Sequence, residues 1–516
     1  MRLLLSNMRL PDERYGDLNA SLGACRVAEQ RIQKILGKYG RTLVLDCISE
    51  NLDRSERRIR ARIQDLPDGE YCYEDYLEYY DGEVLDPVLM RLRLKVSGDQ
   101  LTADFHGSSP QVPGVVNSSL AVAGAGVFVA VKSTLDPQGP VNSGAFRAIG
   151  LNAPEASIVD VRGDAPAGAH GEVRKRAVSV MLGALAQVIP EAVSGDLSGT
   201  SFPNSIGGYS DARGRPYVYI EVPAGGNGGF HEADGSSAFV NVDFGSIRSI
   251  HNVESLESDM PLQVRSCVLR EDSGGEGERR GGLGMRRELR LCEGEAVYSV
   301  LGDRAVIPPF GVHGGGSAQQ LAVSCQRGDA VTLFKTPGKV TGHRIQKDDL
   351  VIMESAGGGG YGDPLNRDPE DVRSDLLSGY ITPHRAKAGY GVVFTGEGKV
   401  DNDRTRALRL DIRGRRLALT VKADETNPYI GNRGKRRVVR LSQTTVERLG
   451  VCVGDLIELV GNHPAPLRCW IGFGEDIEDG SCPMDAFGRS VLGLNESESV
   501  WVRPLPGPSA AGGMAV

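Results

Sequence analysis

The sequence lacks the cysteine pattern of a disulfide-stabilised protein. Its nine cysteines include no Cys-x-x-Cys pair, and their number is odd. This usage favours a reduced, intracellular compartment over a disulfide framework. No run of about 18 apolar residues is present, so no membrane span is predicted. Arg2, Arg9 and Asp12 interrupt the N-terminus, which argues against a secretory leader. We therefore expect a cytoplasmic protein.

Three functional signatures are also missing. The net charge is −8, so there is no basic footprint of the kind that nucleic-acid binding requires. No Gly-x-x-x-x-Gly-Lys-Ser/Thr phosphate loop occurs, and no Gly-x-Ser-x-Gly elbow occurs. The chain is therefore not expected to bind ATP through such a loop or to act as a common serine hydrolase.

Glycine, in contrast, is abundant and concentrated. Many of the 68 glycines gather in three runs, at 223–229, 272–284 and 355–363. Glycine costs conformational entropy and contributes no packing, so dense runs form either flexible linkers or tight turns where backbone approaches something closely. Hydrophobic segments such as 261–269 flank these runs, and this setting predicts structured loops between strands.

Periodicity predicts an α+β fold, rich in β-structure and with several helices. Apolar spacing indicates helices over 18–40, 48–63, 120–135 and 173–189. Alternation indicates strands over 88–96 and 101–105, and residues 200–354 contain mostly short strands and glycine loops. We assign residues 1–395 to one catalytic region.

The C-terminal part has a different character. Residues 396–434 are polar and are predicted to be a linker. Beyond them, 441–459 resembles 484–502, and each copy contains a short helix, a Leu-Gly turn, an acidic turn and a strand. Two such copies can interleave into a closed barrel without exposed edges. Residues 435–505 resemble the double-psi barrel at the N-terminus of AAA-type ATPases, and 506–516 are expected to form a flexible tail.

An ordered series of motifs covers residues 3 to about 393. They lie at 3–20, 104–111, 142–147, 182–187, 272–284, 302–311 and 357–369. This series resembles the hydantoinase B/oxoprolinase family. Its members include N-methylhydantoinase and 5-oxoprolinase subunits and the large subunits of ATP-dependent acetone and acetophenone carboxylases.

The resemblance implies a subunit of an ATP-dependent amidohydrolase that acts on a phosphorylated cyclic amide or imide. In the family, an actin-like partner, the hydantoinase A-type subunit, is thought to bind ATP and activate the substrate. Family members usually carry a long further segment before the region seen here, with the positions that look like a metal site. The resemblance therefore places a divalent metal, Mn or Zn, on a partner chain that supplies this segment. We expect a natural split of the subunit, with a fragment as the alternative.

Two other functions stay open. One is a subunit of an ATP-dependent ketone carboxylase, and the other is a non-catalytic scaffold whose barrel docks partners. Many hydantoinases carry His-Thr-His-Met-Thr-Asn-Thr where this chain has 242–248, a departure that raises the carboxylase alternative.

Four residues are candidates for catalysis. Glu172 aligns with a family Asn-x-Glu segment, and burial would let it act as a general base on water. It could instead be an acid that favours the helix dipole. His170 precedes it. Asp17 is either a helix N-cap or an active-site carboxylate. Asp272 opens the second glycine run.

The remaining candidates concern substrate and metal. Successive amides in tight turns can form an anion nest, so the glycine loops could bind the phosphorylated intermediate or could be simple turns. The substrate-binding candidates are Asn142, Gly225, Gly226, Asn227, Gly228, Gly274 and Gly275. His231 and Asp234, with Asp243 beyond them, could ligate a hard divalent metal or could form a surface pair.

Overall fold

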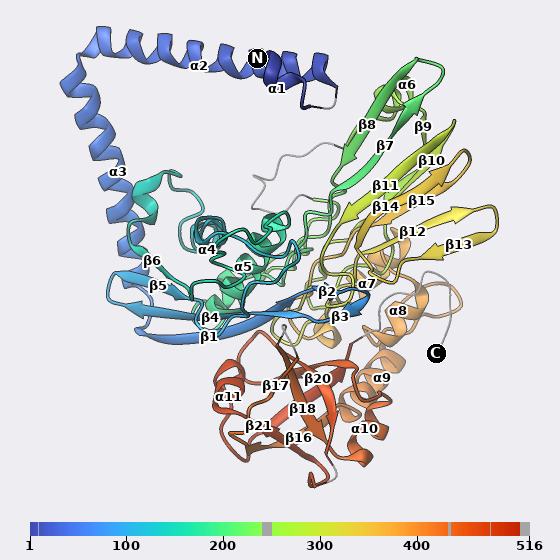
Figure 1. Ribbon diagram of the computed structural model, residues 1–516. Coiled ribbons are helices and arrows are strands. Elements are labelled where there is room, and N and C mark those ends of the chain that lie inside the picture. Colours follow the sequence, from blue (N-terminus) through green and yellow to red (C-terminus); the bar gives the residue numbers. More distant parts are fainter. Residues whose placement is uncertain (9, 240–249, 432–434, 475, 506–516) are drawn as a thin grey trace.

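A computed structural model describes residues 1–516 except 9, 240–249, 432–434, 475 and 506–516. The chain forms a mixed α+β fold, as the periodicity predicts. Its parts are an N-terminal helical arm, a first layer of sheet and helices, a pair of further sheets, a small helical cluster and a C-terminal barrel (Figure 1).

The first layer is a four-stranded sheet covered by two helices. Its strand order is β1-β4-β5-β6, antiparallel except for the parallel pair β5/β6. The strands are β1 (Gly69–Leu77), β4 (Val88–Ser97), β5 (Gln100–Asp104) and β6 (Ile149–Asn152), and the helices are α4 (Leu120–Leu135) and α5 (His170–Leu185). A short ribbon of β2 (Tyr80–Asp81) and β3 (Val84–Leu85) extends from it. Alternate β4 residues from Val88 to Val96 are buried, which confirms the predicted strand with one wet face.

Two further sheets lie beside this layer. One has the order β13-β12-β15-β10-β9 and the other β14-β11-β7-β8. Their strands are β7 (Asn204–Ser210), β8 (Arg215–Glu221), β9 (Leu262–Leu269), β10 (Met285–Leu291), β11 (Glu295–Leu301), β12 (Ala322–Arg327), β13 (Ala330–Leu333), β14 (Lys339–Gln346) and β15 (Leu350–Glu354). The two sheets share an apolar core that includes Leu289, Tyr298 and Met353. Helix α6 (Val253–Asp259) packs beside β9.

The glycine runs form a buried core made of backbone. Segments 195–199, 225–229, 273–284, 309–316 and 355–362, the glycine bundle, lie against one another and exchange amide hydrogen bonds. A Cβ atom on Gly359 would lie 1.7 Å from the carbonyl oxygen of Phe310. A Cβ on Gly228 would lie 1.8 Å from the oxygen of Gly195. These close approaches require glycine because no side chain fits between the segments.

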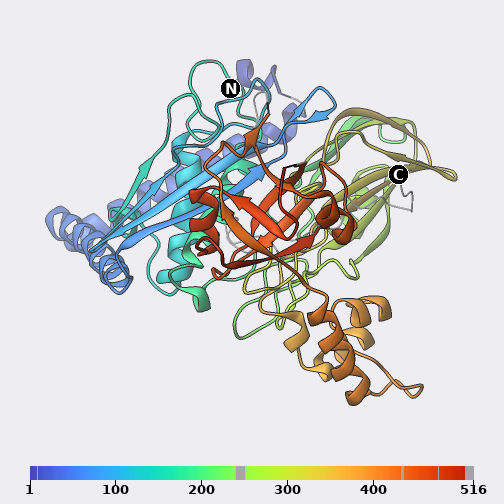
Figure 2. The ribbon, with the colours of Figure 1, turned by 90° about the horizontal axis from the view of Figure 1, so that it is seen from below.

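The barrel lies across the junction of the other parts (Figure 2). Its strand order is β17-β18-β20-β19-β22-β16-β21, with β18/β20 and β16/β21 parallel. The strands are β16 (Leu417–Ala423), β17 (Tyr429–Ile430), β18 (Arg436–Leu441), β19 (Leu456–Val460), β20 (Leu467–Phe473), β21 (Ser481–Met484) and β22 (Ser499–Pro504). Helices α10 (Gln443–Leu449) and α11 (Ala486–Leu492) each end at a left-handed glycine, Gly450 or Gly493. Both predicted Leu-Gly turns are therefore helix ends.

The range 396–434, predicted to be a linker, is largely folded. It contains α9 (Asn402–Gly414), which follows α7 (Pro369–Leu377) and α8 (Pro383–Ala388) in the helical cluster. It also contains β16, which pairs with β21 and β22 inside the barrel. The polar composition of this range concealed the alternation of Leu417, Leu419 and Val421, whose pairing partners lie far along the chain. The predicted tail, 506–516, lies outside the described residues.

The N-terminal arm consists of α1 (Arg2–Leu5), α2 (Pro11–Tyr39) and α3 (Arg41–Gln64). The last part of α3 packs on the first layer through Ser55, Ile59 and Ile63, whereas α2 has no buried residue. Figure 1 shows α2 standing clear of the sheets. Within the described part of the chain, no helix is long and apolar enough to cross a membrane.

Candidate functional site

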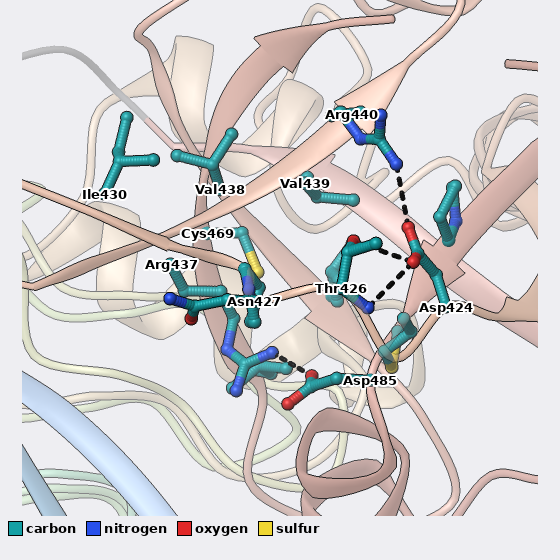
Figure 3. A pocket seen from close by; sticks show the side chains of 15 residues that line it. Asp424, Thr426, Asn427, Ile430, Arg437, Val438, Val439, Arg440, Cys469 and Asp485 are labelled. Atoms are coloured by element: carbon teal, nitrogen blue, oxygen red, sulfur yellow. Dashed lines mark hydrogen bonds and ion pairs between the residues drawn. The ribbon is translucent and has the colours of Figure 1, made fainter. Parts of the chain in front are cut away.

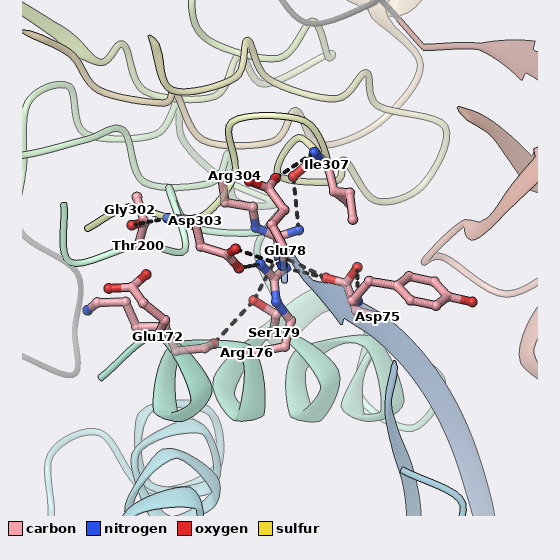
Figure 4. Close-up of polar contacts among 12 residues, drawn as sticks. Asp75, Glu78, Glu172, Arg176, Ser179, Thr200, Gly302, Asp303, Arg304 and Ile307 are labelled. Atoms are coloured by element: carbon pink, nitrogen blue, oxygen red, sulfur yellow. Dashed lines mark hydrogen bonds and ion pairs between the residues drawn. The ribbon is translucent and has the colours of Figure 1, made fainter. Parts of the chain in front are cut away.

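A cluster of buried charges lies where the first layer, the glycine bundle and the barrel meet (Figure 4). Its members, the ionic cluster, all have side chains at most 1% exposed. They are Asp75 of β1, Arg176 of α5, Asp196, Asp303, Arg304 and Arg468 of β20. Charges this deep persist only when they are paired and hydrogen-bonded.

The arginines of the ionic cluster each bridge carboxylates from distant segments. Arg176 donates to Asp75 at 2.6 Å and to Asp303 at 2.6 Å. Arg304 donates to Asp75 at 2.9 Å and also to Asp196. Every carboxylate in the cluster thus contacts a cation, and the network fixes α5 against the loop that carries residues 303 and 304.

Two carboxyl groups, one in the cluster and one beside it, have pKa values that burial raises to about 7. Burial raises the pKa of Asp196 to about 7, because desolvation and the negative charge of Asp75 outweigh Arg176. Burial and the charge of Asp303 raise the pKa of Glu78 to about 7. The backbone amides of residues 305, 306 and 307 donate to Glu78 at 3.1, 2.7 and 2.9 Å.

Glu172 is a third buried carboxyl group near this cluster. It lies in the first turn of α5 and is 2% exposed. Its Oε1 accepts a hydrogen bond from the amide of Ser201 at 2.9 Å, while Oε2 has no hydrogen-bond partner among the described residues. Burial and, next, the charge of Asp303 raise its pKa. A buried carboxyl with a raised pKa and one oxygen without a hydrogen-bond partner is a candidate for general acid–base chemistry.

The other predicted catalytic residues have contacts of their own, and His170 lies in the same first turn of α5 as Glu172. His170 is exposed, and its Nδ1 lies 3.0 Å from the oxygen of Ala167. Asp17 is not an N-cap, because α2 begins at Pro11, and its exposed carboxylate pairs with Arg14 at 2.7 Å. Asp272 accepts hydrogen bonds from the amide and hydroxyl of Thr382 at 2.8 and 2.7 Å. Within the described residues, none of these three side chains forms a hydrogen bond or ion pair with Glu172, which accepts a hydrogen bond from the amide of Ser201.

The predicted substrate-binding residues also serve the fold. Asn142 caps a 3₁₀ turn by accepting from the amide of Gly144 and donates to Ser55. Gly225, Gly226, Asn227, Gly228, Gly274 and Gly275 lie inside the glycine bundle. The amides of Gly226 and Gly275 donate to the carbonyls of Ala356 and Gly358 at 3.0 and 2.9 Å. These two amides are occupied and are not available to an anion, which favours the alternative that the loops are tight turns.

The two residues of the predicted metal pair, His231 and Asp234, each contact a different side chain. Both oxygens of Asp234 accept hydrogen bonds from Arg367 at 2.7 Å, which lowers the pKa of Asp234 against the effect of burial. His231 is exposed, and its Nδ1 lies 3.3 Å from the hydroxyl of Tyr361. No group of three or more His, Cys, Asp or Glu side chains in the described ranges could hold a metal ion. Asp243 lies outside those ranges.

The barrel contains a cavity of about 120 Å³ (Figure 3). Its charged lining is self-paired, since Arg440 donates to Asp424 at 2.9 Å and Arg437 donates to Asp485. With these groups occupied, the cavity offers no free charge for a substrate. One of its lining residues, Arg437, also donates to Glu74 of β1 at 2.6 Å, which connects the barrel to the first layer.

Most of the ionic cluster was not predicted from the sequence. Arg176 is the last of three consecutive basic residues in α5, and Asp75 follows Glu74 in a tyrosine-rich strand. Runs of charge such as these usually lie on a solvated face, so the sequence carried no local signal of a buried network. Only residues 302–304 had been singled out, as one of the family motifs.

Comparisons with known proteins agree with this geometry. The sequence model described as Hydantoinase B/oxoprolinase matches residues 1–364. A protein from Pseudomonas sp. strain NS671, assigned by name as the B-type subunit of a D-/L-hydantoinase, is 32% identical over 79% of this chain and 69% of its own length. The crystal structure of an ATP-dependent caprolactamase from Pseudomonas jessenii has a TM-score of 0.74 at 29% identity, covering 79% of this chain and 71% of that chain. A nucleotide-free acetone carboxylase has a TM-score of 0.72 at 19% identity, covering 80% and 62%.

Proposed function

Because this chain belongs to the hydantoinase B/oxoprolinase family, we propose that it is a subunit of an ATP-dependent amidohydrolase that opens a cyclic amide or imide. The observation that carries the proposal within this chain is the buried carboxyl of Glu172, with its raised pKa and one unoccupied oxygen. Catalytic acids and bases need such tuning to work near neutral pH.

The chemistry divides between this chain and its partners. Amide resonance makes a lactam carbonyl a poor electrophile, and transfer of a phosphoryl group to its oxygen relieves this. An ATP-binding partner of the hydantoinase A type performs that transfer, since the sequence contains no phosphate loop. Water then adds to the activated carbon while Glu172 accepts its proton. The same carboxyl returns the proton to the ring nitrogen as the carbon–nitrogen bond breaks, which leaves an acyl phosphate. A second water then hydrolyses the acyl phosphate to the open-chain carboxylate and inorganic phosphate.

A divalent metal, Mn or Zn, belongs in this proposal to the partner chain that supplies the rest of the family fold. The described residues of this chain do not fit a metal, because His231 and Asp234 are engaged elsewhere. No step assigned here to Glu172 depends on that ion.

The carboxylase alternative has weaker support. The likeness to acetone carboxylase, at 19% identity, establishes a shared fold alone. The departure at 242–248 that raised this alternative falls outside the described residues. The scaffold alternative requires that this chain contribute no reacting group.

The test is turnover by the purified complex with ATP and lactams, hydantoins, or ketones with bicarbonate. We expect Glu172→Gln to lower kcat for the cyclic amide by about 10²–10⁴-fold, because Gln cannot accept the proton. Glu155→Gln, at an exposed carboxylate, is the matched control and should retain activity.

Three outcomes would contradict parts of the proposal. Full activity of Glu172→Gln would remove Glu172 from the mechanism. Product formation from ketones and bicarbonate alone would favour the carboxylase. If none of the substrate classes stimulates ATP consumption by the complex, only the scaffold function remains.

A further inference from the structure

A lysine of β14 lies among the buried carboxyl groups and takes no part in the steps given above. Lys339 is the first residue of β14, and its side chain is 13% exposed. Its ammonium donates to the carbonyl of Gly302 at 2.8 Å and to Oδ1 of Asp303 at 3.1 Å. Lysine is rarely buried to this extent unless it is paired, so these two contacts hold the ammonium in place.

The backbone around Lys339 directs its side chain to this position. Lys339 pairs with Leu301 where β14 meets β11, and Gly338, which precedes it, has a left-handed φ of 74°. The amide of Gly302 donates to the carbonyl of Gly338 at 2.6 Å. This contact between two glycines brings the start of β14 against the loop that carries Asp303, so the lysine side chain reaches the carboxylate.

Asp303 does not need the lysine to complete its hydrogen bonds. Its Oδ2 accepts from Arg176 at 2.6 Å, and its Oδ1 accepts from the amide of Glu78 at 2.9 Å. Lys339 therefore adds a positive charge where both oxygens are already hydrogen-bonded. That charge matters because Arg176 is shared with Asp75, which leaves the buried charge of Asp303 only partly compensated.

Asp303 is also tied to the residues that hold Glu172. The hydroxyl of Thr200 accepts from the amide of Asp303 at 2.9 Å (Figure 4), and the next amide, that of Ser201, donates to Glu172 at 2.9 Å. Arg176, which pairs with Asp303, follows Glu172 by one turn on the same face of α5. Two separate connections thus link Asp303 to the carboxyl group of Glu172.

The charges around these carboxyl groups come from several segments. They are Lys175 and Arg176 of α5, Glu78 and Tyr80 just beyond β1, Asp303 itself and Lys339 of β14. Burial and then the charge of Asp303 raise the pKa of Glu172, whereas Lys175 lowers it. Burial and Asp303 also raise the pKa of Glu78, and Lys339 opposes them. A change in the net charge at Asp303 therefore acts on Glu172.

We propose that Lys339 is a positioning residue for the proposed amide hydrolysis. Its ammonium holds Asp303 and compensates the charge of that carboxylate, so that Glu172 can receive a proton from water. The inference rests on the proposed role of Glu172, and Lys339 acts only through Asp303.

The pH dependence of turnover by the purified complex, with ATP and a cyclic amide, tests this role. Lys339→Met removes a positive charge beside Asp303, which disfavours the ionised form of Glu172 and raises its pKa. Because a base acts in its ionised form, the rising limb of kcat should move to higher pH by about one pH unit, with a roughly tenfold loss below the limb and recovery above it. KM should change less than about twofold, since Lys339 does not contact the substrate.

Matched variants separate the charge of Lys339 from its packing. Lys339→Arg keeps the positive charge and should keep the limb in place. Lys335→Met removes an exposed lysine four positions away, which pairs with Glu83 at 2.7 Å, and should also leave the limb unchanged. If circular dichroism shows that Lys339→Met does not fold, Lys339→Gln takes its place, because its amide can still donate to the carbonyl of Gly302.

Infrared difference spectroscopy measures the same effect without turnover. The spectrum of the full chain minus that of Glu172→Gln isolates the carboxyl stretch of protonated Glu172, and its pH titration gives the pKa. In the Lys339→Met background, the same difference should titrate about one pH unit higher. This measurement needs neither ATP nor substrate, so it separates the effect of Lys339 from the proposed function.

The proposal fails on any of three results. An unchanged infrared midpoint would mean that Lys339 does not act on Glu172. A shifted midpoint with an unchanged limb of kcat would mean that the link has no part in the reaction. Full turnover by Glu172→Gln would remove the proposed base and with it the positioning role, even where the infrared midpoint shifts.

Discussion

The glycines of the glycine bundle and those of helix α2 have opposite structural meaning. In the bundle, backbone oxygen lies within 2 Å of where a Cβ of Gly228 or Gly359 would stand. In α2, a Cβ on Gly16, Gly23 or Gly37 would meet nothing. The first set is required because chains touch there, whereas the second set only weakens a helix. What a glycine does is therefore decided by its tertiary neighbours and not by its own conformational freedom.

The largest expected effect is a substitution inside the bundle. Gly359→Ala places a methyl group 1.7 Å from the carbonyl oxygen of Phe310, and backbone on both sides leaves no room to yield. We expect a loss of more than ~4 kcal/mol in the free energy of unfolding, or failure to fold. Denaturant unfolding followed by fluorescence measures it.

The matched control is Gly23→Ala, in the middle of α2. Alanine favours a helix over glycine by about 1 kcal/mol, and no atom obstructs the new methyl group. The control should fold with equal or higher stability. Equal tolerance of both substitutions would show that the bundle is not closely packed and would remove the contrast.

A slightly smaller effect is expected where side chains meet the edge of the bundle. Arg304→Met leaves Asp75 and Asp196 with one cation fewer at a fully buried position. Removing one partner of a buried ion pair costs about 3–5 kcal/mol. The double variant with Asp196→Asn should recover part of this loss, because it removes a stranded charge. Strictly additive losses would mean that the two side chains do not act together.

The effect that is smallest per step, because it is spread over about three pH units, is a dependence of stability on pH. The pKa of Asp196 is about 7 in the folded chain and near its ordinary value when unfolded, so the folded chain holds a proton that the unfolded chain releases. The stabilisation is complete below about pH 4 and declines as the pH rises to about 7, by on the order of 1 kcal/mol per unit.

Asp196→Asn isolates this contribution. The variant has no titrating group at the site, so its stability should change less between pH 4 and 7 than that of the wild type. The difference between the two unfolding curves, measured in the same buffers, removes the contributions of other carboxylates. Parallel curves would place the pKa of Asp196 near its ordinary value.

Local pattern predicted the elements well. The apolar run 120–135 coincides with α4, and the alternation over 88–96 lies within β4. Glycine at position 40 ends α2 as expected. Boundaries were less accurate, because α2 begins seven residues before the predicted start and Pro11 occupies the first helical position. The range 396–434 was wrongly predicted to be a linker because it contains β16, whose pairing partners lie far along the chain, at residues 481–484 and 499–502.

The site was predicted only in part. The family resemblance directed attention to Glu172, but its burial depends on how α5 packs under residues 200–201. The arginine pairs join residues more than a hundred positions apart, as Arg176 does with Asp75 and Asp303. No spacing along the chain encodes such pairs. The pairing of Asp234 with Arg367, 133 positions along the chain, was likewise not indicated by any local pattern.

The sequence by itself determined the helices and strands, the duplicated units of the barrel and the family, because these depend on periodicity and local motifs. Only the tertiary structure decided that the glycine runs form a core, that six distant charges share one cluster and that α2 is left without a partner among the described residues. The physical reason is that close backbone packing and buried ion pairs are set by distances in space. Residues far apart in the chain reach those distances only when the whole fold has formed.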